Sequence, residues 1–297
     1  MKHKMSRLEK VNMRNGYLFL LPNFIGFLCF VFIPAIAAFV LSFTKWDAFT
    51  PPSFIGFDNF IKMLGDETFH ISFINNLIYT LGSVPLTLFL SLIIALALNQ
   101  NLKFLNTFRV IYFLPHITAM VAVAMIWRML YHPQFGPINM VLMDLGIKNP
   151  PGWISSSSWA LFSIILMSAW KSCGYYMVIL LAGLKGIPRH LYEAAEIDGA
   201  SAWERFWNVT WPMLSPTMFF VLVVSVISSF KVFDSINIMT QGGPGRSTNV
   251  LVYYIYKLGF QNYDFGYASA IALVLFAMIM IMTVIQFRGQ KKWVEYM

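Results

Sequence analysis

The sequence predicts an all-α integral membrane protein with six transmembrane helices. Of the 297 residues, 58% are hydrophobic and only 11% are charged, whereas soluble domains carry about 25% charged residues. Six mostly apolar stretches reach the length of about 20 residues that a helix needs to cross a bilayer. They cover residues 17–43, 73–98, 107–131, 159–183, 213–236 and 268–287. These observations exclude an ordinary soluble globular protein.

The first stretch is expected to be an uncleaved anchor, although basic residues precede it as they precede a signal peptide. The apolar core of a signal peptide has about 7–15 residues, and the run over 17–43 is much longer. We therefore divide the chain into a basic N-terminal tail (1–16), a first transmembrane helix (17–43), a core of five helices (73–287) and a C-terminal tail (288–297).

The distribution of basic residues predicts the orientation. With both termini on one side, that side carries thirteen Lys and Arg residues and the other side five, so the positive-inside rule places both termini in the cytoplasm. The net charge of +8 then reflects orientation, and no basic patch interleaved with aromatic residues indicates nucleic acid. Cys29 and Cys173 lie in separate apolar stretches, where a thiol acts as a small hydrophobe; neither a disulfide nor a metal site is expected.

Ionisable residues inside the spans are candidates for function, because a charge in hydrocarbon is costly. Lys171 is at the middle of the fourth span and shares a helix face with Ser168 and Tyr175. This face either lines a polar path or forms a buried hydrogen-bonded core. Lys231 and Asp234 are three residues apart on the fifth span, where they can form a structural pair or contact a substrate.

Two further polar residues in the third span receive structural interpretations. Arg128 is near the outer end, where its side chain can extend to the interface. His116 follows Pro115, and a proline inside a helix frees a carbonyl that a neighbouring side chain can satisfy, so a kink is expected there.

The cytoplasmic loop over 188–212 predicts a hairpin of two short helices. Pro188 can open the first helix, and Gly199 suits the left-handed conformation that ends it. Ser201 and Glu204 form a Ser-x-x-Glu capping box that starts the second helix, and Pro212 is expected to end it before the fifth span.

The first hairpin helix carries a small, acid-rimmed surface formed by Glu193, Ala194, Ala195 and Glu196. Such a surface can enter a groove on another protein, with its charges fixing the register. The alternative is a connector lying on the membrane, but a membrane-surface helix is typically rich in Lys and Arg on its polar face.

The pattern Glu193-Ala-Ala-x-x-x-Gly199, followed by Val209-x-Trp-Pro212, resembles the EAA loop of binding-protein-dependent ABC importer permeases. That loop usually ends Ile-x-Leu-Pro, so Val209 and Trp211 depart from it. Residues 42–47, 54–60, 135–139 and 239–244 are similar to stretches of the maltose-type first permease of the carbohydrate-uptake branch. The likeness runs from about residue 17 to the last span and implies a type I ABC importer transmembrane fold with a cytoplasmic coupling hairpin.

The resemblance implies one half of a heterodimeric sugar channel in a bacterial or archaeal cell membrane. Its partners would be a second permease, two ATPase subunits that hold ATP and Mg, and an extracytoplasmic sugar-binding protein. The implied ATPase-coupling residues are Glu193, Ala194, Ala195, Glu196, Asp198, Gly199 and Pro212. The implied substrate path comprises Ser168, Lys171, Ser172, Tyr175, Ser228, Ser229 and Val232, to which we add Lys231 and Asp234.

No cofactor and no catalytic role are expected for the chain itself. It lacks the Gly-x-x-x-x-Gly-Lys-Ser/Thr phosphate loop, so its energy must come from a partner. It also lacks His-Glu-x-x-His and Gly-x-Ser-x-Gly motifs, which leaves an intramembrane enzyme without a motif. The alternative from another class is an ion-coupled secondary transporter that uses Lys171, Lys231 and Asp234 as a relay, although such proteins commonly contain internal repeats and none is visible here.

Overall fold

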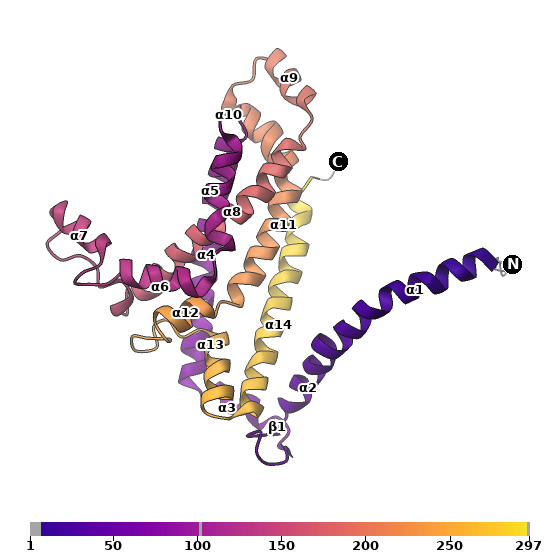
Figure 1. Ribbon diagram of the computed structural model, residues 1–297, viewed down its shortest axis with the longest axis vertical. Coiled ribbons are helices and arrows are strands. Elements are labelled where there is room, and N and C mark those ends of the chain that lie inside the picture. Colours follow the sequence, from indigo (N-terminus) through magenta and orange to yellow (C-terminus); the bar gives the residue numbers. More distant parts are fainter. Residues whose placement is uncertain (1–6, 101–102, 296–297) are drawn as a thin grey trace. The chain divides into compact units, whose positions relative to one another are not determined.

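The computed structural model describes residues 7–100 and 103–295 (Figure 1). The chain forms two compact units, a first unit of Met1–Leu64 with Leu258–Leu273 and a second unit of Gly65–Lys257 with Val274–Met297. Parts of the expected tails (1–6 and 296–297) and of one cytoplasmic turn (101–102) lie outside the described residues. Within the described residues, five helices are long and apolar enough to cross a membrane, or six if one bent pair counts as a single span.

The first unit begins with a long apolar helix at the position of the first predicted span. It comprises α1 (Arg7–Phe27), a π-helical turn (Leu28–Phe32) and α2 (Ile33–Leu41), so part of the predicted tail is already helical. Two short antiparallel strands follow, β1 (Thr44–Lys45) and β2 (Ser53–Phe54), and then α3 (Asp58–Leu64).

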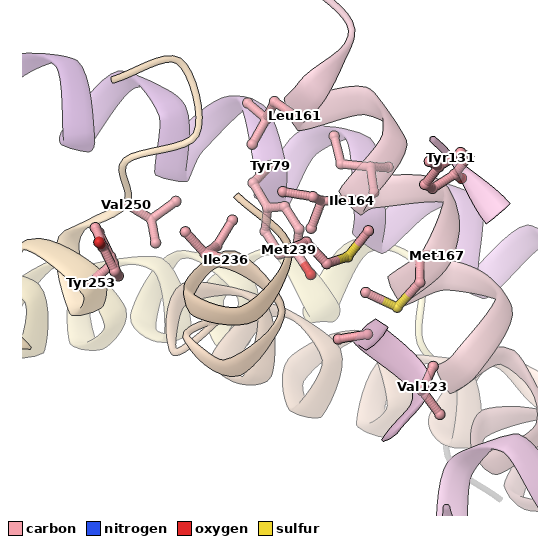
Figure 2. Close-up of a cluster of buried hydrophobic side chains, with 12 residues drawn as sticks. Tyr79, Val123, Tyr131, Leu161, Ile164, Met167, Ile236, Met239, Val250 and Tyr253 are labelled. Carbon is pink, nitrogen blue, oxygen red and sulfur yellow. The ribbon is translucent and has the colours of Figure 1, made fainter. Parts of the chain in front are cut away.

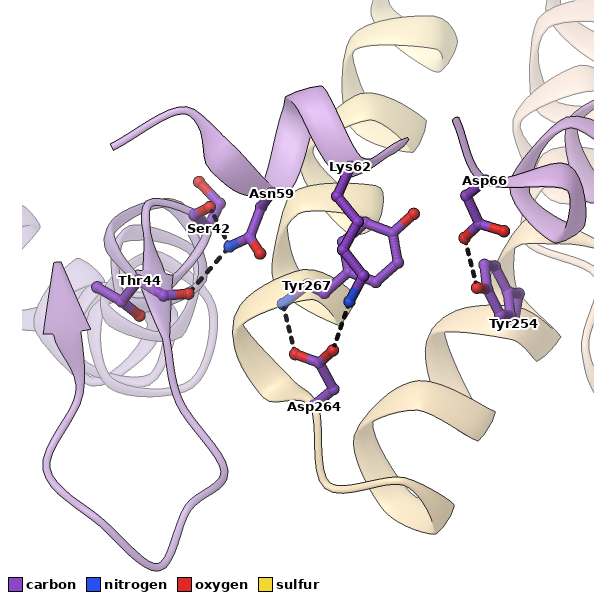
Figure 3. Close-up of polar contacts among 8 residues, drawn as sticks. All are labelled: Ser42, Thr44, Asn59, Lys62, Asp66, Tyr254, Asp264 and Tyr267. Atoms are coloured by element: carbon purple, nitrogen blue, oxygen red, sulfur yellow. Dashed lines mark hydrogen bonds and ion pairs between the residues drawn. The ribbon is translucent and has the colours of Figure 1, made fainter. Parts of the chain in front are cut away.

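Buried and charged contacts close the first unit (Figure 3). Asn59 donates hydrogen bonds to the backbone oxygens of Ser42 and Thr44, both at 2.9 Å. Lys62 pairs with Asp264 at 2.9 Å and lies over the ring of Tyr267, 4.0 Å from its centroid. These contacts fix α3 against the start of α14.

The second unit is a helical bundle. It contains α4 (Glu67–Leu98), α5 (Leu105–Ile117), α6 (Met120–Leu130), α7 (Pro137–Asp144), α8 (Ala160–Lys185), α9 (Arg189–Ile197), α10 (Ala202–Arg205), α11 (Trp211–Phe230), α12 (Asp234–Met239) and α13 (Leu251–Tyr256). Helix α14 (Phe265–Gly289) starts in the first unit and ends in the second. Short turns complete the order: Trp153–Ser155 and Gln290–Lys292 are 3₁₀, and Phe206–Thr210 and Lys257–Gln261 are π-helical. The fourth and sixth predicted spans are confirmed within a few residues as α8 and α14.

Two predicted spans differ from the structure. The third is broken: α5 and α6 meet at 93°, so the kink expected near Pro115 is a complete change of direction. The fifth was predicted to run to residue 236, but α11 ends at Phe230. Apolar residues resume after a single polar residue at each break, Thr118 and Lys231, so the average hydropathy of the segment does not locate the breaks.

Two apolar clusters form the core of the second unit. The first joins α4, α6, α8 and α12, with Tyr79, Val123, Ile164, Met167 and Ile236 among its buried members (Figure 2). The second joins the other end of α4 to α8 and α11, and Leu98, Met177, Leu180, Leu214 and Val221 are buried in it. Along α8 the first cluster uses residues 161–167 and the second uses 176–184. The polar residues of α8 between these two segments, 168–175, lie next to the cavity described below.

Candidate functional site

A polar cavity of about 260 Å³ lies between the two apolar clusters of the second unit. It is bounded by α4, α5, α6, α8, α11 and the start of α12. Its walls comprise Tyr79, Ser83, Val84, Thr87, His116, Met120, Ser168, Lys171, Ser172, Tyr176, Ser225, Ser228, Ser229, Lys231, Val232, Phe233, Asp234 and Ser235. Eight of these side chains carry a hydroxyl on Ser or Thr.

The structure brings together eight of the nine residues predicted for a substrate path. Ser168, Lys171, Ser172, Ser228, Ser229, Lys231, Val232 and Asp234 all line the cavity. Tyr175 is not among the lining residues; its ring stacks on His116 instead, with centroids 4.5 Å apart and planes at 13°. The neighbouring Tyr176 lines the cavity in its place.

Lys171 is buried, with 9% of its surface exposed. Its Nζ donates to the backbone oxygens of Pro115, His116 and Thr118, each at 2.9 Å. Lys171 is therefore hydrogen-bonded within the core, as one of the two interpretations of its helix face expects, and it also lines the polar cavity.

The expected helical pair of Lys231 and Asp234 is wrong. Helix α11 ends at Phe230, Lys231 follows it as the C-cap, and Asp234 is the first residue of α12. The backbone leaves helical geometry between them, at Phe233 with φ −143°, so the i, i+3 spacing of one helix does not apply. No ion pair joins them within the part of the chain that the structure describes. Each instead lies at a helix end whose dipole favours its charge.

The wall formed by α4 was missed, although a signal was present. Polar residues at 72, 76, 80, 83, 87 and 91 follow helical spacing and are all buried. Several form bonds between helices: Ser91 donates to the Cys173 carbonyl at 2.9 Å, and Ser229 donates to Thr80 Oγ1 at 3.0 Å. Small polar residues of this kind join helices within membranes, and the same stripe supplies Ser83 and Thr87 to the cavity.

The cavity suits a ligand that both donates and accepts hydrogen bonds. The hydroxyls of Ser83 and Ser235 are buried and have no hydrogen-bond partner within residues 7–100 and 103–295. Buried polar groups are nearly always paired, so these atoms are available to a bound molecule. In the same described residues, no three His, Cys, Asp or Glu side chains come close enough to hold a metal ion.

The loop over 188–212 forms the predicted hairpin, which projects from one end of the bundle (Figure 1). Pro188 caps α9, Gly199 is left-handed with φ +77°, and the capping box of Ser201 and Glu204 is present. Glu204 Oε2 accepts from the Ser201 backbone N–H at 2.7 Å, and Ser201 Oγ accepts from the Glu204 N–H at 3.3 Å. An ion pair between Glu196 and Arg205 links α9 to α10.

The expectation that Pro212 ends the second hairpin helix is wrong. The helix continues from α10 through the π-helical turn Phe206–Thr210 into α11, and Pro212 is the second residue of α11. A proline clashes with the carbonyl four residues earlier in an α-helix, and the wider π-turn just before it removes that geometry. The hairpin is therefore continuous with a membrane-spanning helix.

Most of the predicted coupling residues lie on the hairpin surface. Glu193, Ala194, Glu196, Asp198 and Gly199 are exposed, and Ala195 and Pro212 are half-buried. Sequence reasoning missed two large apolar side chains beside them, Ile197 at 86% and Trp203 at 70% exposure. Both residues lie within four positions of Gly199, which ends the helix, and this position in the sequence could have indicated that they are exposed.

Comparisons with known proteins identify the family. Residues 72–293 match the model of the binding-protein-dependent transport system inner membrane component. A probable ABC transporter permease, YesP of Bacillus subtilis, is 40% identical and covers 99% of this chain and 96% of its own. The trehalose/maltose transport system permease MalF of Thermococcus litoralis is 34% identical over 94% and 95% of the two chains.

A solved structure supports the same assignment. A chain of a bacterial alginate ABC transporter, crystallised in complex with an alginate pentasaccharide-bound periplasmic protein, aligns with a TM-score of 0.84 and 25% identity over 97% of this chain and 98% of its own. The resemblance stated from the EAA pattern is confirmed. The chain belongs to the family of binding-protein-dependent transport system inner membrane components, and it is a membrane-spanning permease subunit of an ABC transporter.

Proposed function

We propose that this permease forms one half of the translocation path of an ATP-driven sugar importer and that its polar cavity holds the sugar in transit. The observation that carries the proposal is the hydroxyl-lined cavity between two apolar clusters. Sugar hydroxyls donate and accept hydrogen bonds, as do the Ser and Thr side chains of the walls. The apolar clusters on either side restrict a polar solute to this segment.

The names of relatives support a sugar of the oligosaccharide type. A trehalose/maltose permease and an arabinooligosaccharide permease are among them, whereas a third relative is a permease for sn-glycerol-3-phosphate, which is not a saccharide. The alginate transporter was crystallised with a pentasaccharide-bound periplasmic protein. By analogy, an extracytoplasmic binding protein delivers the sugar to this chain and a second, homologous permease completes the path.

The hairpin of α9 and α10 is the proposed contact with the ATPase subunits. Ile197 and Trp203 are exposed beside the acidic Glu193, and exposed apolar side chains rimmed by charge are typical of a protein interface. Because α10 continues into α11, a displacement of the hairpin is transmitted to a wall of the cavity. ATP and Mg would bind to the ATPases, and the termini and the hairpin would lie in the cytoplasm.

In this cycle the protein alternates between two states, and each ligand shifts the balance only through different affinities for them. ATP favours the state that closes the ATPase dimer, and the loaded binding protein favours the state open to the outside. Sugar transfer then needs no catalytic residue in this chain.

The test begins with purification of the tagged chain from its native membrane in mild detergent. Recovery of an ATPase and a second permease is expected. Uptake by reconstituted vesicles is then measured with trehalose, maltose, arabinooligosaccharides and sn-glycerol-3-phosphate. Uptake of one of them should require ATP. A chain recovered alone that transports with an ion gradient and without ATP would refute the proposal in favour of a secondary transporter.

A cavity variant adds a structural control. Ser228→Leu fills part of the cavity, where Ser228 is exposed to the open space. It should reduce uptake at least tenfold while the complex assembles normally. Phe220→Leu, at a 54% exposed position of the same helix outside the cavity, should transport like the wild type. Equal uptake by both variants would show that this cavity is not the path.

A further inference from the structure

The break between α5 and α6 is not explained by proline. A proline disturbs the helix on its N-terminal side, where its ring meets the carbonyl four residues earlier. Helix α5 passes through Pro115 and ends at Ile117, and the extended residues are Thr118 and Ala119. The change of direction by 93° thus follows the proline and needs another cause.

A helix end leaves its last four carbonyls without backbone donors. At the end of α5, the Leu114 carbonyl accepts from the N–H and the hydroxyl of Thr118, at 3.3 and 2.9 Å. The Pro115 and His116 carbonyls, and that of Thr118 beyond the helix, accept from Lys171 Nζ. An ammonium has three protons and no acceptor, so these three bonds use its whole hydrogen-bonding capacity.

Two neighbours of Lys171 hold the same segment. A side chain at Gly174 would place its Cβ 1.8 Å from the Tyr112 carbonyl oxygen, so the backbones of α5 and α8 touch there. The ring of Tyr175 stacks on His116. Residues 171, 174 and 175 share one face of α8, and that face grips α5 from residue 112 to 118.

We propose that Lys171 is a positioning residue: it caps α5, holds the break between α5 and α6, and thereby sets the cavity wall that His116 and Met120 form. Its ammonium is occupied by the protein and does not bind the transported solute. The assignment rests on the proposed function only in treating the cavity as the transport path.

Removal of the lysine has a defined structural consequence. Carbonyls without donors are not tolerated within a membrane. The carbonyls of Pro115 and His116 can regain partners if the N–H groups of Ala119 and Met120, four residues further on, bond to them in an α-helix. That change joins α5 and α6 into one continuous helix, the single straight span that hydropathy predicts.

The test measures the bend directly. Spin labels are placed at Phe108 and Met129, which are 43% and 68% exposed, in the complete complex with Cys29 replaced by Ser and the buried Cys173 retained. At 1.5 Å per residue, the labelled backbones are about 31 Å apart in a straight helix and about 22 Å apart across a right-angle bend. The wild type should show the shorter distance and Lys171→Met the longer one, with a raised KM for uptake.

Two matched variants separate the possible causes. Lys171→Arg keeps a cationic donor group and should keep the short distance and restore uptake. Pro115→Ala keeps the lysine and should also keep the short distance. A distance of about 31 Å between the labels in Pro115→Ala would assign the break to proline and overturn the proposal. This variant keeps the proposal testable even if Lys171→Met fails to assemble.

Direct binding of solute gives a different pattern. If the ammonium contacts the solute, Lys171→Met slows uptake while the distance stays near 22 Å, and the proposal is wrong. A complex that transports none of the tested solutes contradicts the proposed function and leaves the distance measurement intact. The two failures are therefore distinguishable.

Discussion

The hairpin that we assign to ATPase coupling depends on the left-handed backbone of Gly199. Its φ is +77°, and the Ala200 N–H bonds to the Ala195 carbonyl at 2.9 Å, which is the Schellman closure of a helix. A Cβ at Gly199 would meet nothing within 4 Å. A substitution there therefore has no steric cost, and the penalty comes from the backbone alone.

Because a side chain at Gly199 meets no neighbour, the cost of a substitution is the cost of its left-handed backbone conformation. Alanine in the left-handed region costs about 1–2 kcal/mol, asparagine costs less because it occupies this region more often, and a β-branched residue costs more. We expect Gly199→Asn, Gly199→Ala and Gly199→Val to loosen the hairpin in that order. A cost of about 1 kcal/mol corresponds to a roughly fivefold change in the opening equilibrium.

Two assays on the assembled complex measure the effect. Hydrogen exchange of the Ala200 amide should accelerate about fivefold in Gly199→Ala and more in Gly199→Val. Sugar uptake per ATP hydrolysed should fall in the same order, because a looser hairpin transmits less of its displacement. Gly289→Ala, where a Cβ also meets nothing and φ is −68°, is the control. Equal behaviour of the three Gly199 variants would refute the reasoning.

Three further results are expected. Gly174→Ala should destabilise the complex by about 1–3 kcal/mol in thermal unfolding, because its Cβ would lie 1.8 Å from a carbonyl oxygen of α5. Hydrogen bonds, first of all from the Thr50 backbone N–H, lower the pKa of Asp47. The stability that these bonds give to the loop is present above the ordinary pKa of Asp and is lost as the pH falls through the lowered pKa. Faster exchange of the Thr50 amide at low pH measures that loss. Arg205→Gln should weaken the hairpin by only about 0.2–1 kcal/mol by the same exchange assay, since its partner Glu196 is 61% exposed.

Each expectation has a control. Gly186→Ala brings a Cβ only to 3.3 Å from its nearest neighbour and should leave the melting temperature nearly unchanged; equal losses at both glycines would contradict the packing argument. Asp47→Asn should remove the pH dependence of Thr50 amide exchange, after correction for the intrinsic exchange rate. If the dependence persists in this variant, another titratable group causes it. A loss well above 1 kcal/mol in Arg205→Gln would mean that the arginine contacts more than Glu196.

Local composition was enough to predict most of the fold. The apolar runs that became α8 and α14 are long, and their ends coincide with polar or aromatic residues, so their limits were found within a few positions. The hairpin was also predictable, because Gly199, Ser201 and Glu204 act on backbone groups within a few residues of themselves. The signals and the structures that they specify are both local.

The breaks were not predictable in the same way. The end of α5 is capped by Lys171, which lies 53–56 residues away in sequence, and no feature of residues 105–130 alone encodes that bond. The α4 wall was missed for a different reason. A neutral Ser or Thr costs little in a transmembrane segment, so a search for costly charges passes over it, although its helical spacing was visible.

The positions of the charged residues bear on how the solute is recognised. Lys171 lies at the C-terminal end of α5, Lys231 follows the C-terminus of α11, and Asp234 begins α12. Each charge thus has the sign that its helix dipole favours, so the broken helices account for charges that would otherwise indicate an ion relay. The cavity also contains the hydroxyls of Ser83 and Ser235, which have no hydrogen-bond partner within the residues that the structure describes. These hydroxyls can bond to a neutral solute, whereas the ammonium of Lys171 is already held by backbone oxygens of the protein.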